Sequence, residues 1–179
     1  MEVYMIRHTA VDVPSGVCYG QTDVPLKESF EEEATIVKQN LQGLSFDACY
    51  TSPLSRCTRL ATYCGYADAI RDDRLKELNF GDWEMQEFNR IHDPRLAEWF
   101  GDYLHVPATR GESFEQLHAR VADFLTALRE KDVERVAVFT HGGVLIAAQV
   151  YVGLVSPEEG FKNLTPYGGM IKIMMNDEV

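Results

Sequence analysis

The chain has 179 residues, of which 45% are hydrophobic and 25% charged, and its formal net charge is −11. This length fits one domain over residues 1–179, with enough apolar residues to bury a sizeable core. The acidic charge excludes a nucleic-acid partner, whose surface needs clustered Lys and Arg, and it requires any anion site to gather its positive charge locally.

The chain begins with an apolar strand, so we expect no signal peptide. Its longest apolar stretches are far shorter than a membrane span, so we expect a cytoplasmic protein with no membrane partner. The sequence does not indicate an oligomeric state. The cysteines show neither CxxC spacing nor a histidine at zinc-site distance, so we expect reduced thiols and no metal. They are Cys18, Cys49, Cys57 and Cys64.

The first part of the chain predicts a strand, a loop and a helix. Residues 2–7 are a short apolar run that suits a buried strand. The loop over 9–27 contains Gly and Pro, which interrupt regular structure. Ser29 and Glu32 have the spacing of a capping box, in which each side chain bonds the other residue's backbone N–H. This box predicts a helix that ends near Leu41.

The next segment predicts a second strand that leads directly into a helix. Residues 47–51 form the strand. Ser52 suits the N-cap and Pro53 the first position of a helix to about Tyr63, because the first turn leaves its N–H groups without a helical partner. A short extended segment over 69–71 follows.

The second half of the chain is irregular before it returns to helices and strands. Residues 85–110 are rich in aromatic side chains and broken by Pro and Gly, and the sequence leaves open whether they act as a lid. Ser113 and Gln116 make another capping box, followed by apolar residues at helical spacing. The remaining predicted elements are a strand over 134–140, a helix over 144–151 and a strand over 170–175.

This alternation predicts an α/β fold, with a mostly parallel central sheet between two helical layers, α/β/α. In such sheets ligands bind beyond the carboxyl ends of the strands. His8 follows the first strand, and His141 follows the strand over 134–140. The two imidazoles are therefore expected at the same edge of the sheet.

Two imidazoles with nearby cations suit phosphoryl transfer. A neutral His8 can attack phosphorus and hold it as a phosphohistidine, which splits hydrolysis into two easier steps. Arg56 is predicted in the first turn of a helix, where its guanidinium adds to the N–H groups that bind an anion. Gly142 lets the backbone approach an anion closely. Arg7 can share the site if the strand ends near His8, because neighbouring strand residues point to opposite faces.

The leaving oxygen needs a proton donor, and a carboxyl group in a loop near the histidines would provide it. Glu77, which precedes Phe80 and Gly81, is the preferred candidate, and Glu84 is the alternative. Taken singly, these residues also suit a core histidine, a solvated arginine or a turn carboxylate. Their joint placement favours a functional site.

Four blocks of the sequence resemble the histidine phosphatase superfamily, the phosphoglycerate mutase-like group. They are Arg7-His8-Thr9, the segment from Thr51 to Arg56, Glu77 before Phe80-Gly81, and Thr140-His141-Gly142. The blocks occur in the family's order and span nearly the whole chain. The resemblance implies the phosphoglycerate mutase-like fold, a small-molecule phosphate ester as substrate, and no metal or other cofactor. It implies His8 as nucleophile, Glu77 as general acid, and a phosphate pocket of Arg7, Arg56 and His141.

The first loop departs from the family pattern. Thr9 stands where members usually carry Gly, and Val11 and Pro14 stand where they often carry Thr and Asn. Backbone groups, or Gln21 and Thr22, are therefore expected to replace the family's side-chain contact to phosphate.

Within the family, residues 16–26 and 80–85 resemble α-ribazole phosphatases of cobalamin biosynthesis. This implies α-ribazole 5′-phosphate as preferred substrate. The expected substrate-binding residues are Tyr19, Gly20, Gln21, Thr22 and Gly142. Tyr19 and the aromatic residues of 85–110 could stack on a flat base or form a satellite hydrophobic cluster. The alternatives are a broad-specificity or sugar-phosphate phosphatase, a phosphoglycerate mutase, and a silent phosphoester-binding module.

Overall fold

The computed structural model describes residues 1–176; residues 177–179, which the single-domain prediction includes, lie outside the described part. Its strands are β1 (Glu2–Arg7), β2 (Ala48–Thr51), β3 (Ile70–Arg71), β4 (Arg135–Thr140) and β5 (Met170–Met174). They form one sheet in the order β3-β2-β4-β1-β5. β1 to β4 are parallel, and β5 pairs antiparallel with β1 at one edge. The predicted mostly parallel sheet is confirmed.

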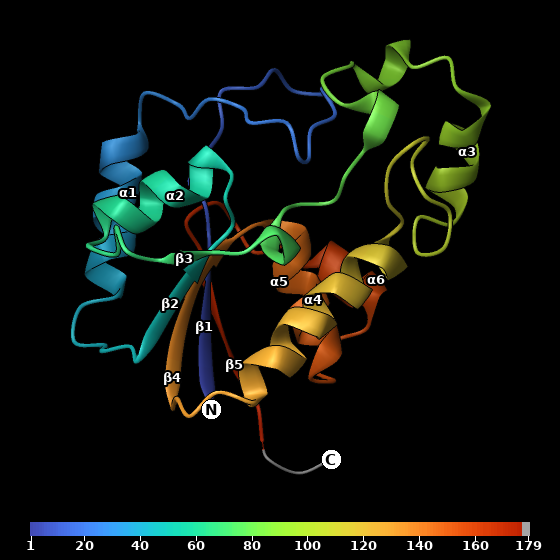
Figure 1. The fold of residues 1–179 in the computed structure, drawn as a ribbon. Helices are drawn as coiled ribbons and strands as arrows, with labels where there is room; N and C mark the ends of the chain where they lie inside the picture. The colour runs from blue at the N-terminus through green and yellow to red at the C-terminus, as the bar shows by residue number, and fades with distance from the viewer. Residues whose placement is uncertain (177–179) are drawn as a thin grey trace.

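Helices cover both faces of this sheet (Figure 1). The helices are α1 (Phe30–Asn40), α2 (Ser55–Tyr63), α3 (Pro94–Gly101), α4 (Phe114–Arg129), α5 (Gly142–Tyr151) and α6 (Pro157–Lys162). α1 and α2 lie on one face and α4 and α5 on the other, with α6 against α5 and α3 apart from the sheet. The predicted α/β/α layers are confirmed. Within residues 1–176, no helix is long and apolar enough to cross a membrane.

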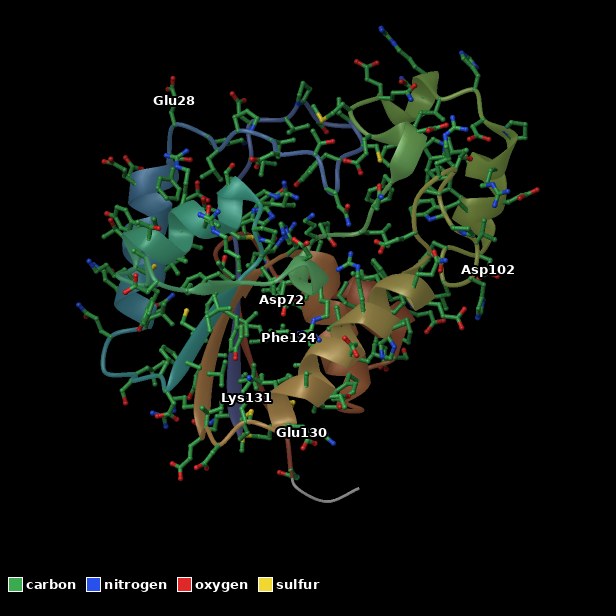
Figure 2. The ribbon with its side chains drawn as sticks, in the orientation of Figure 1. Glu28, Asp72, Asp102, Phe124, Glu130 and Lys131 are labelled. Atoms are coloured by element: carbon green, nitrogen blue, oxygen red, sulfur yellow. The ribbon has the colours of Figure 1, made fainter. Side chains whose placement is uncertain are left out.

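Side chains of the central strands alternate between two cores. Val3 and Met5 of β1 belong to the core under α4 and α5, whereas Ile6 belongs to the core under α1 and α2. Phe124 of α4 lies on the side that faces the sheet (Figure 2), and its ring meets Tyr50 edge to face with centroids 5.3 Å apart. Because both faces are buried, these strands appear in the sequence as continuous apolar runs.

The start of α1 differs from the prediction. The Ser29 hydroxyl bonds no backbone N–H of the helix and instead donates to the Glu33 carboxylate at 2.7 Å. The other Glu33 oxygen accepts from the N–H of Ala10 in the first loop at 3.1 Å. The predicted capping box with Glu32 is therefore wrong, because Glu33 holds Ser29 and ties the helix to that loop.

The start of α2 also differs. The helix begins at Ser55, later than predicted, and its first turn is capped from the first loop. The Asp23 carboxylate accepts from the backbone N–H of Ser55 at 2.9 Å and from its hydroxyl at 2.6 Å. The Ser52 hydroxyl lies 2.8 Å from Nε2 of His141. The assignment of Ser52 and Pro53 to the N-cap and first position is therefore wrong, because contacts from distant residues replace the local cap.

Other helix starts follow the sequence more closely. The capping box of Ser113 and Gln116 is present at α4, as predicted. α5 begins at Gly142, slightly earlier than predicted. α6 was not predicted, although Ser156 and Glu159 form a complete capping box in front of it.

Residues 85–110 contain α3 and a short 3₁₀ turn, and they pack on a small core separate from the two main ones. Trp83 belongs to this small core and is 1% exposed. Its ring meets that of Trp99 of α3 edge to face, with centroids 5.9 Å apart. A satellite hydrophobic cluster is thus present in this region. The role of 85–110 as a lid stays a prediction.

Candidate active site

The carboxyl ends of parallel strands meet at one edge of the sheet. β1 ends at Arg7, β4 at Thr140 and β2 at Thr51. The His8 N–H donates to the carbonyl of Thr140 at 3.2 Å. The rings of His8 and His141 lie edge to face with centroids 5.2 Å apart. The two histidines lie together at this edge, where their positions after two strands predicted them.

The His8 imidazole is neutral and has a fixed tautomer. Its Nδ1 lies 2.8 Å from the carbonyl oxygen of Thr9. A carbonyl only accepts, so Nδ1 carries the hydrogen and Nε2 keeps its lone pair. Burial, followed by the charges of Arg56 and Arg7, lowers the pKa of His8 from 6.5 to about 3. At neutral pH this side chain can therefore act as a nucleophile.

Arg7 shares the site with its neighbour because β1 ends there. Its Nη1 donates to the carbonyl of Thr165 at 2.7 Å, and the Tyr167 ring centroid lies 4.2 Å from its guanidinium carbon. Within residues 1–176 its buried Nε has no hydrogen-bond partner. A Cβ at Gly142 would lie 3.1 Å from that Nε. Gly142 therefore allows the first turn of α5 to approach the guanidinium.

Arg56 is fully buried in the first turn of α2. Its guanidinium donates to the carbonyls of Gly20 and Thr22, the latter at 2.8 Å. The ring centroid of Tyr19 lies 5.5 Å from its guanidinium carbon. In the described part of the chain, its Nε is a second buried donor without a partner. The first loop therefore holds Arg56 through main-chain oxygens and covers it with Tyr19.

Glu84 fastens the same loop. One carboxylate oxygen accepts from the N–H groups of Gly20 and Thr22 at 2.9 and 3.0 Å, and from the Thr22 hydroxyl at 2.7 Å. The other oxygen accepts from the N–H of Phe80 at 2.9 Å. A Cβ at Gly20 would lie 1.9 Å from the carbonyl oxygen of Leu78, so only glycine fits there. Glu84 thus organises the loop that positions Arg56.

The carboxylate of Glu77 lies at the N-terminus of α5. It accepts from the N–H of Gly143 at 3.1 Å and from that of Leu78 at 2.8 Å. Arg120 of α4 holds the backbone of this segment, donating to the carbonyls of Glu77 at 2.8 Å and Lys76 at 2.6 Å. The helix terminus and Arg120 together fix the position of the Glu77 side chain.

His141 is fully buried beside these groups. Its Nε2 lies 2.8 Å from the Ser52 hydroxyl and 3.5 Å from the Cys57 thiol. Burial, followed by the charges of Arg56 and His8, lowers the pKa of His141 well below its usual value. Burial also raises the pKa of Cys57. The histidines are therefore neutral, and the positive charge of the site resides on the arginines.

A cavity of about 480 Å³ lies at this edge of the sheet. Its polar wall consists of Arg7, His8, Glu77, Gly142 and Gly143. Its aromatic wall consists of Phe80, Trp99, Phe100, Tyr103, Phe114 and Phe161, and further lining comes from Tyr19, Leu78, Leu117 and Leu164. A polar patch of this kind within an apolar pocket is typical of small-molecule sites.

The predicted site residues fall into two groups. Those that line the cavity are Arg7, His8, Tyr19, Glu77 and Gly142. Arg56 and His141 are fully buried and do not line it. Gly20, Gln21 and Thr22 do not line it either: two of them hold Arg56, and Gln21 donates to the carbonyl of Glu77 at 3.1 Å. Direct contact with substrate stays a prediction for all ten residues.

Sequence reasoning missed Tyr167 and Arg120. The Tyr167 hydroxyl lies 2.8 Å from that of Tyr19, and its ring lies 5.7 Å from the His8 ring. The turn that carries Tyr167 directly precedes β5, and an antiparallel β5 begins at the site's edge, so recognising that direction would have found it. Arg120 carried no signal, because it is one of several charged residues on an amphipathic helix.

The cysteines of the described chain are free, and residues 1–176 contain no group of three His, Cys, Asp or Glu side chains placed to hold a metal ion.

Solved structures with the same fold include an enzyme named as a phosphatase. The crystal structure of the alpha-ribazole phosphatase from Shigella flexneri matches with a TM-score of 0.87 and 25% identity, covering 99% of this chain and 92% of that one. This likeness confirms the predicted phosphoglycerate mutase-like fold.

Sequence comparisons find relatives of the same kind as the structural comparison. The adenosylcobalamin/alpha-ribazole phosphatase of Escherichia coli is 30% identical over 154 residues, 81% of this chain and 75% of that protein. The 2,3-bisphosphoglycerate-dependent phosphoglycerate mutase of Brucella anthropi is 32% identical over 161 residues, 80% of this chain and 76% of that protein. The model of the histidine phosphatase superfamily (branch 1) matches residues 3–178. The chain therefore belongs to the histidine phosphatase superfamily.

Proposed function

We propose that this protein is a metal-independent phosphomonoesterase that works through a phosphohistidine on His8. The observation that carries the proposal is the neutral His8 imidazole, with its lone pair on Nε2, beside the guanidinium groups of Arg7 and Arg56. Both Nε atoms are buried without a partner in residues 1–176, and buried donors in that state are costly. The oxygens of a phosphate group would satisfy them.

In the first step, Nε2 of His8 attacks phosphorus in line with the ester bond. The P–N bond forms as the P–O bond breaks, and the carboxylic acid of Glu77 gives its proton to the departing alkoxide. Arg7, Arg56 and His141 stabilise the charge on the non-bridging oxygens. The Tyr19 ring lies beside this pocket, with its centroid 5.5 Å from the guanidinium carbon of Arg56.

In the second step, water attacks the phosphorus of the phosphohistidine. The carboxylate of Glu77 takes the water proton, the P–N bond breaks, and its electron pair returns to Nε2 of His8. Phosphate leaves, and the imidazole is again neutral with its hydrogen on Nδ1. Glu77 is preferred to Glu84 for both proton transfers because Glu77 lines the cavity, whereas Glu84 is occupied by four donors of the first loop and Phe80.

We further propose α-ribazole 5′-phosphate as the preferred substrate, giving α-ribazole and phosphate, in cobalamin biosynthesis. Support comes from the similarity to the two enzymes named alpha-ribazole phosphatases, one of which matches over 99% of this chain. The similarity to a phosphoglycerate mutase makes phosphoryl return to a substrate hydroxyl the competing activity.

The phosphohistidine is tested by quenching the working enzyme in alkali, where such adducts survive, and mapping the phosphopeptide. Phosphate is expected on the peptide that contains His8. His8→Asn should lose the phosphopeptide and lower kcat at least about 10⁴-fold, because the nucleophile is gone. The matched control is His92→Asn, since His92 is exposed. Turnover by His8→Asn at the wild-type rate would refute the mechanism.

The substrate is tested by comparing kcat/KM for α-ribazole 5′-phosphate, O-phosphoserine and 3-phosphoglycerate. We expect a preference of about tenfold or more for the first ester. Equal values would favour a broad-specificity phosphatase. Faster phosphoryl transfer to a substrate hydroxyl than to water would favour a mutase.

A further inference from the structure

The aromatic wall of the cavity has no evident role in the phosphoryl chemistry. Of the residues that line the cavity, only Arg7 and Glu77 are of the Arg, Lys, Asp or Glu type, and both belong to the polar wall. The rest of the cavity therefore offers a bound molecule no cation with which to pair a carboxylate. A carboxylate that left water for such a wall would lose solvation without gaining a partner.

Two rings of this wall are exposed to solvent and are not part of a buried core. Phe100 of α3 is 60% exposed and Phe161 of α6 is 41% exposed, and neither belongs to the buried part of a core. α3 and α6 lie on the side of the molecule occupied by α4, and the two helices reach the same cavity (Figure 1). Exposed aromatic side chains that converge on a pocket mark a surface that binds an apolar group.

The rings contact one another in a connected set, and most of the pairs meet edge to face. Trp99 meets Phe80 at 5.8 Å and Phe100 at 5.2 Å, while Phe161 meets Tyr103 at 4.8 Å and Phe114 at 5.3 Å. Trp99 and Tyr103, 6.0 Å apart, join the two sets. Phe80 lies in the same segment as Glu77. The wall thus extends from the loop of the proposed general acid to α6.

We propose that this aromatic wall is the subsite for the leaving group, and that it selects phosphomonoesters whose alcohol carries a flat, uncharged aromatic ring system. Phe100 and Phe161 are the specificity-determining residues. The proposal rests on the proposed function, because it assigns the wall to the alcohol that departs from His8. It excludes small alcohols that carry a carboxylate, such as serine and glycerate, as preferred leaving groups.

The test uses two alkyl esters with alcohols of similar basicity, 2-(1-naphthyl)ethyl phosphate and ethyl phosphate. Their kcat/KM ratio isolates the ring, because the bond that breaks is the same. We expect the wild-type protein to prefer the naphthyl ester by about 30-fold or more, and Phe161→Ser and Phe100→Ser each to lower this ratio by about fivefold to tenfold. Phe161→Arg should raise kcat/KM for O-phosphoserine relative to the naphthyl ester.

Ile36→Ser is the matched control, because Ile36 is 58% exposed on α1, which covers the other face of the sheet. It should leave the ratio unchanged. A wild-type ratio near one, or a ratio that survives both Phe100→Ser and Phe161→Ser, overturns the subsite.

The proposed function and the subsite fail in different ways. If no ester is hydrolysed, the proposed function fails, and binding of 2-(1-naphthyl)ethanol measured by calorimetry then tests the wall alone. A Kd that rises at least about fivefold in Phe161→Ser but not in Ile36→Ser supports the subsite. An unchanged Kd, or no binding by the wild-type protein, overturns it.

Discussion

Beside His8, Arg56 is fully buried and bonded to main-chain oxygens, whereas Phe100 and Phe161 of the aromatic wall are exposed and meet other rings. Arg56 is held by two carbonyl groups, and His8 by one. Phe100 has no such restraint and is 60% exposed. Hydrogen bonds to the backbone fix the position of a side chain, whereas contacts between rings still form when one ring is replaced by another apolar side chain. The polar wall is therefore suited to one reaction, and the aromatic wall can set which alcohol leaves.

Apart from loss of the nucleophile, the largest effect is expected from Arg56→Met, which removes charge from the phosphate pocket and leaves the carbonyls of Gly20 and Thr22 without their donor. We expect kcat/KM to fall about 10³-fold and the free energy of unfolding to fall by about 2 kcal/mol. Steady-state kinetics and urea denaturation measure the two effects. Arg59→Met, at an exposed position of the same helix, is the control. Activity within tenfold of wild type would remove Arg56 from the pocket.

Glu77→Gln should separate substrates by their leaving group. We expect kcat/KM for an alkyl phosphate to fall about 10²-fold or more, because kcat/KM covers the steps up to loss of the alcohol and the alkoxide needs a proton as it leaves. For 4-nitrophenyl phosphate, whose leaving group is a weak base, the fall should be less than about tenfold. Glu115→Gln, at an exposed position on α4, serves as the control. Equal losses for both esters would show that Glu77 is not the acid.

Arg120→Met tests whether the backbone bonds behind Glu77 matter to the chemistry. As a positioning residue, Arg120 should affect the two esters in the same way as Glu77 but less strongly. We expect kcat/KM for the alkyl ester to fall about tenfold and that for 4-nitrophenyl phosphate to fall less. Arg129→Met, near the other end of α4, should show no such separation. A loss shared equally by both esters would mean that Arg120 only stabilises the fold.

Stability should depend on pH through His8. Unfolded, this side chain binds a proton near pH 6.5, whereas in the folded protein its pKa is about 3. Between these values the unfolded state binds more protons, so the free energy of unfolding decreases as the pH falls from 6.5 toward 3. One histidine contributes about 1.4 kcal/mol per pH unit in the middle of this window. Urea denaturation of His8→Asn across pH 4–7 should show a correspondingly shallower slope; an unchanged slope would contradict the buried neutral state.

The smallest effect is expected at the aromatic wall. Phe100→Ala should change the free energy of unfolding by no more than about 0.5 kcal/mol, because the ring is 60% exposed. Trp83→Ala, in the small core behind the wall, should cost about 3 kcal/mol or more, because Trp83 is 1% exposed. Thermal or urea denaturation distinguishes the two. A large loss for Phe100→Ala would mean that this wall is part of the packed core.

The strands and the residues that follow them were predictable from the sequence. Buried parallel strands are continuous apolar runs, and their carboxyl ends are marked by the first polar residues, which here are Arg7, His8 and His141. The capping box of Ser113 and Gln116 was also predictable, because its hydrogen bonds join residues only three positions apart in the sequence.

Features that depend on distant residues were not predictable. Asp23 caps α2 across the fold, and Glu33 links α1 to the first loop. The direction of β5, which brings Tyr167 over Arg7, is not written in its apolar pattern. The sequence favoured Glu77 over Glu84 without excluding Glu84, and only the partners of each carboxylate in space reveal that Glu77 lines the cavity and Glu84 holds a loop.

The sequence by itself determined the layered α/β fold, the edge of the sheet that carries the site, and the residue types that suit phosphoryl transfer. These follow from local apolar periodicity and from the order of short motifs. The tertiary structure alone decided the tautomer and neutral state of His8, the main-chain bonds that hold Arg56, and the meeting of α3 and α6 at one aromatic wall. Burial and hydrogen bonding between residues far apart in the chain exist only once the elements have packed.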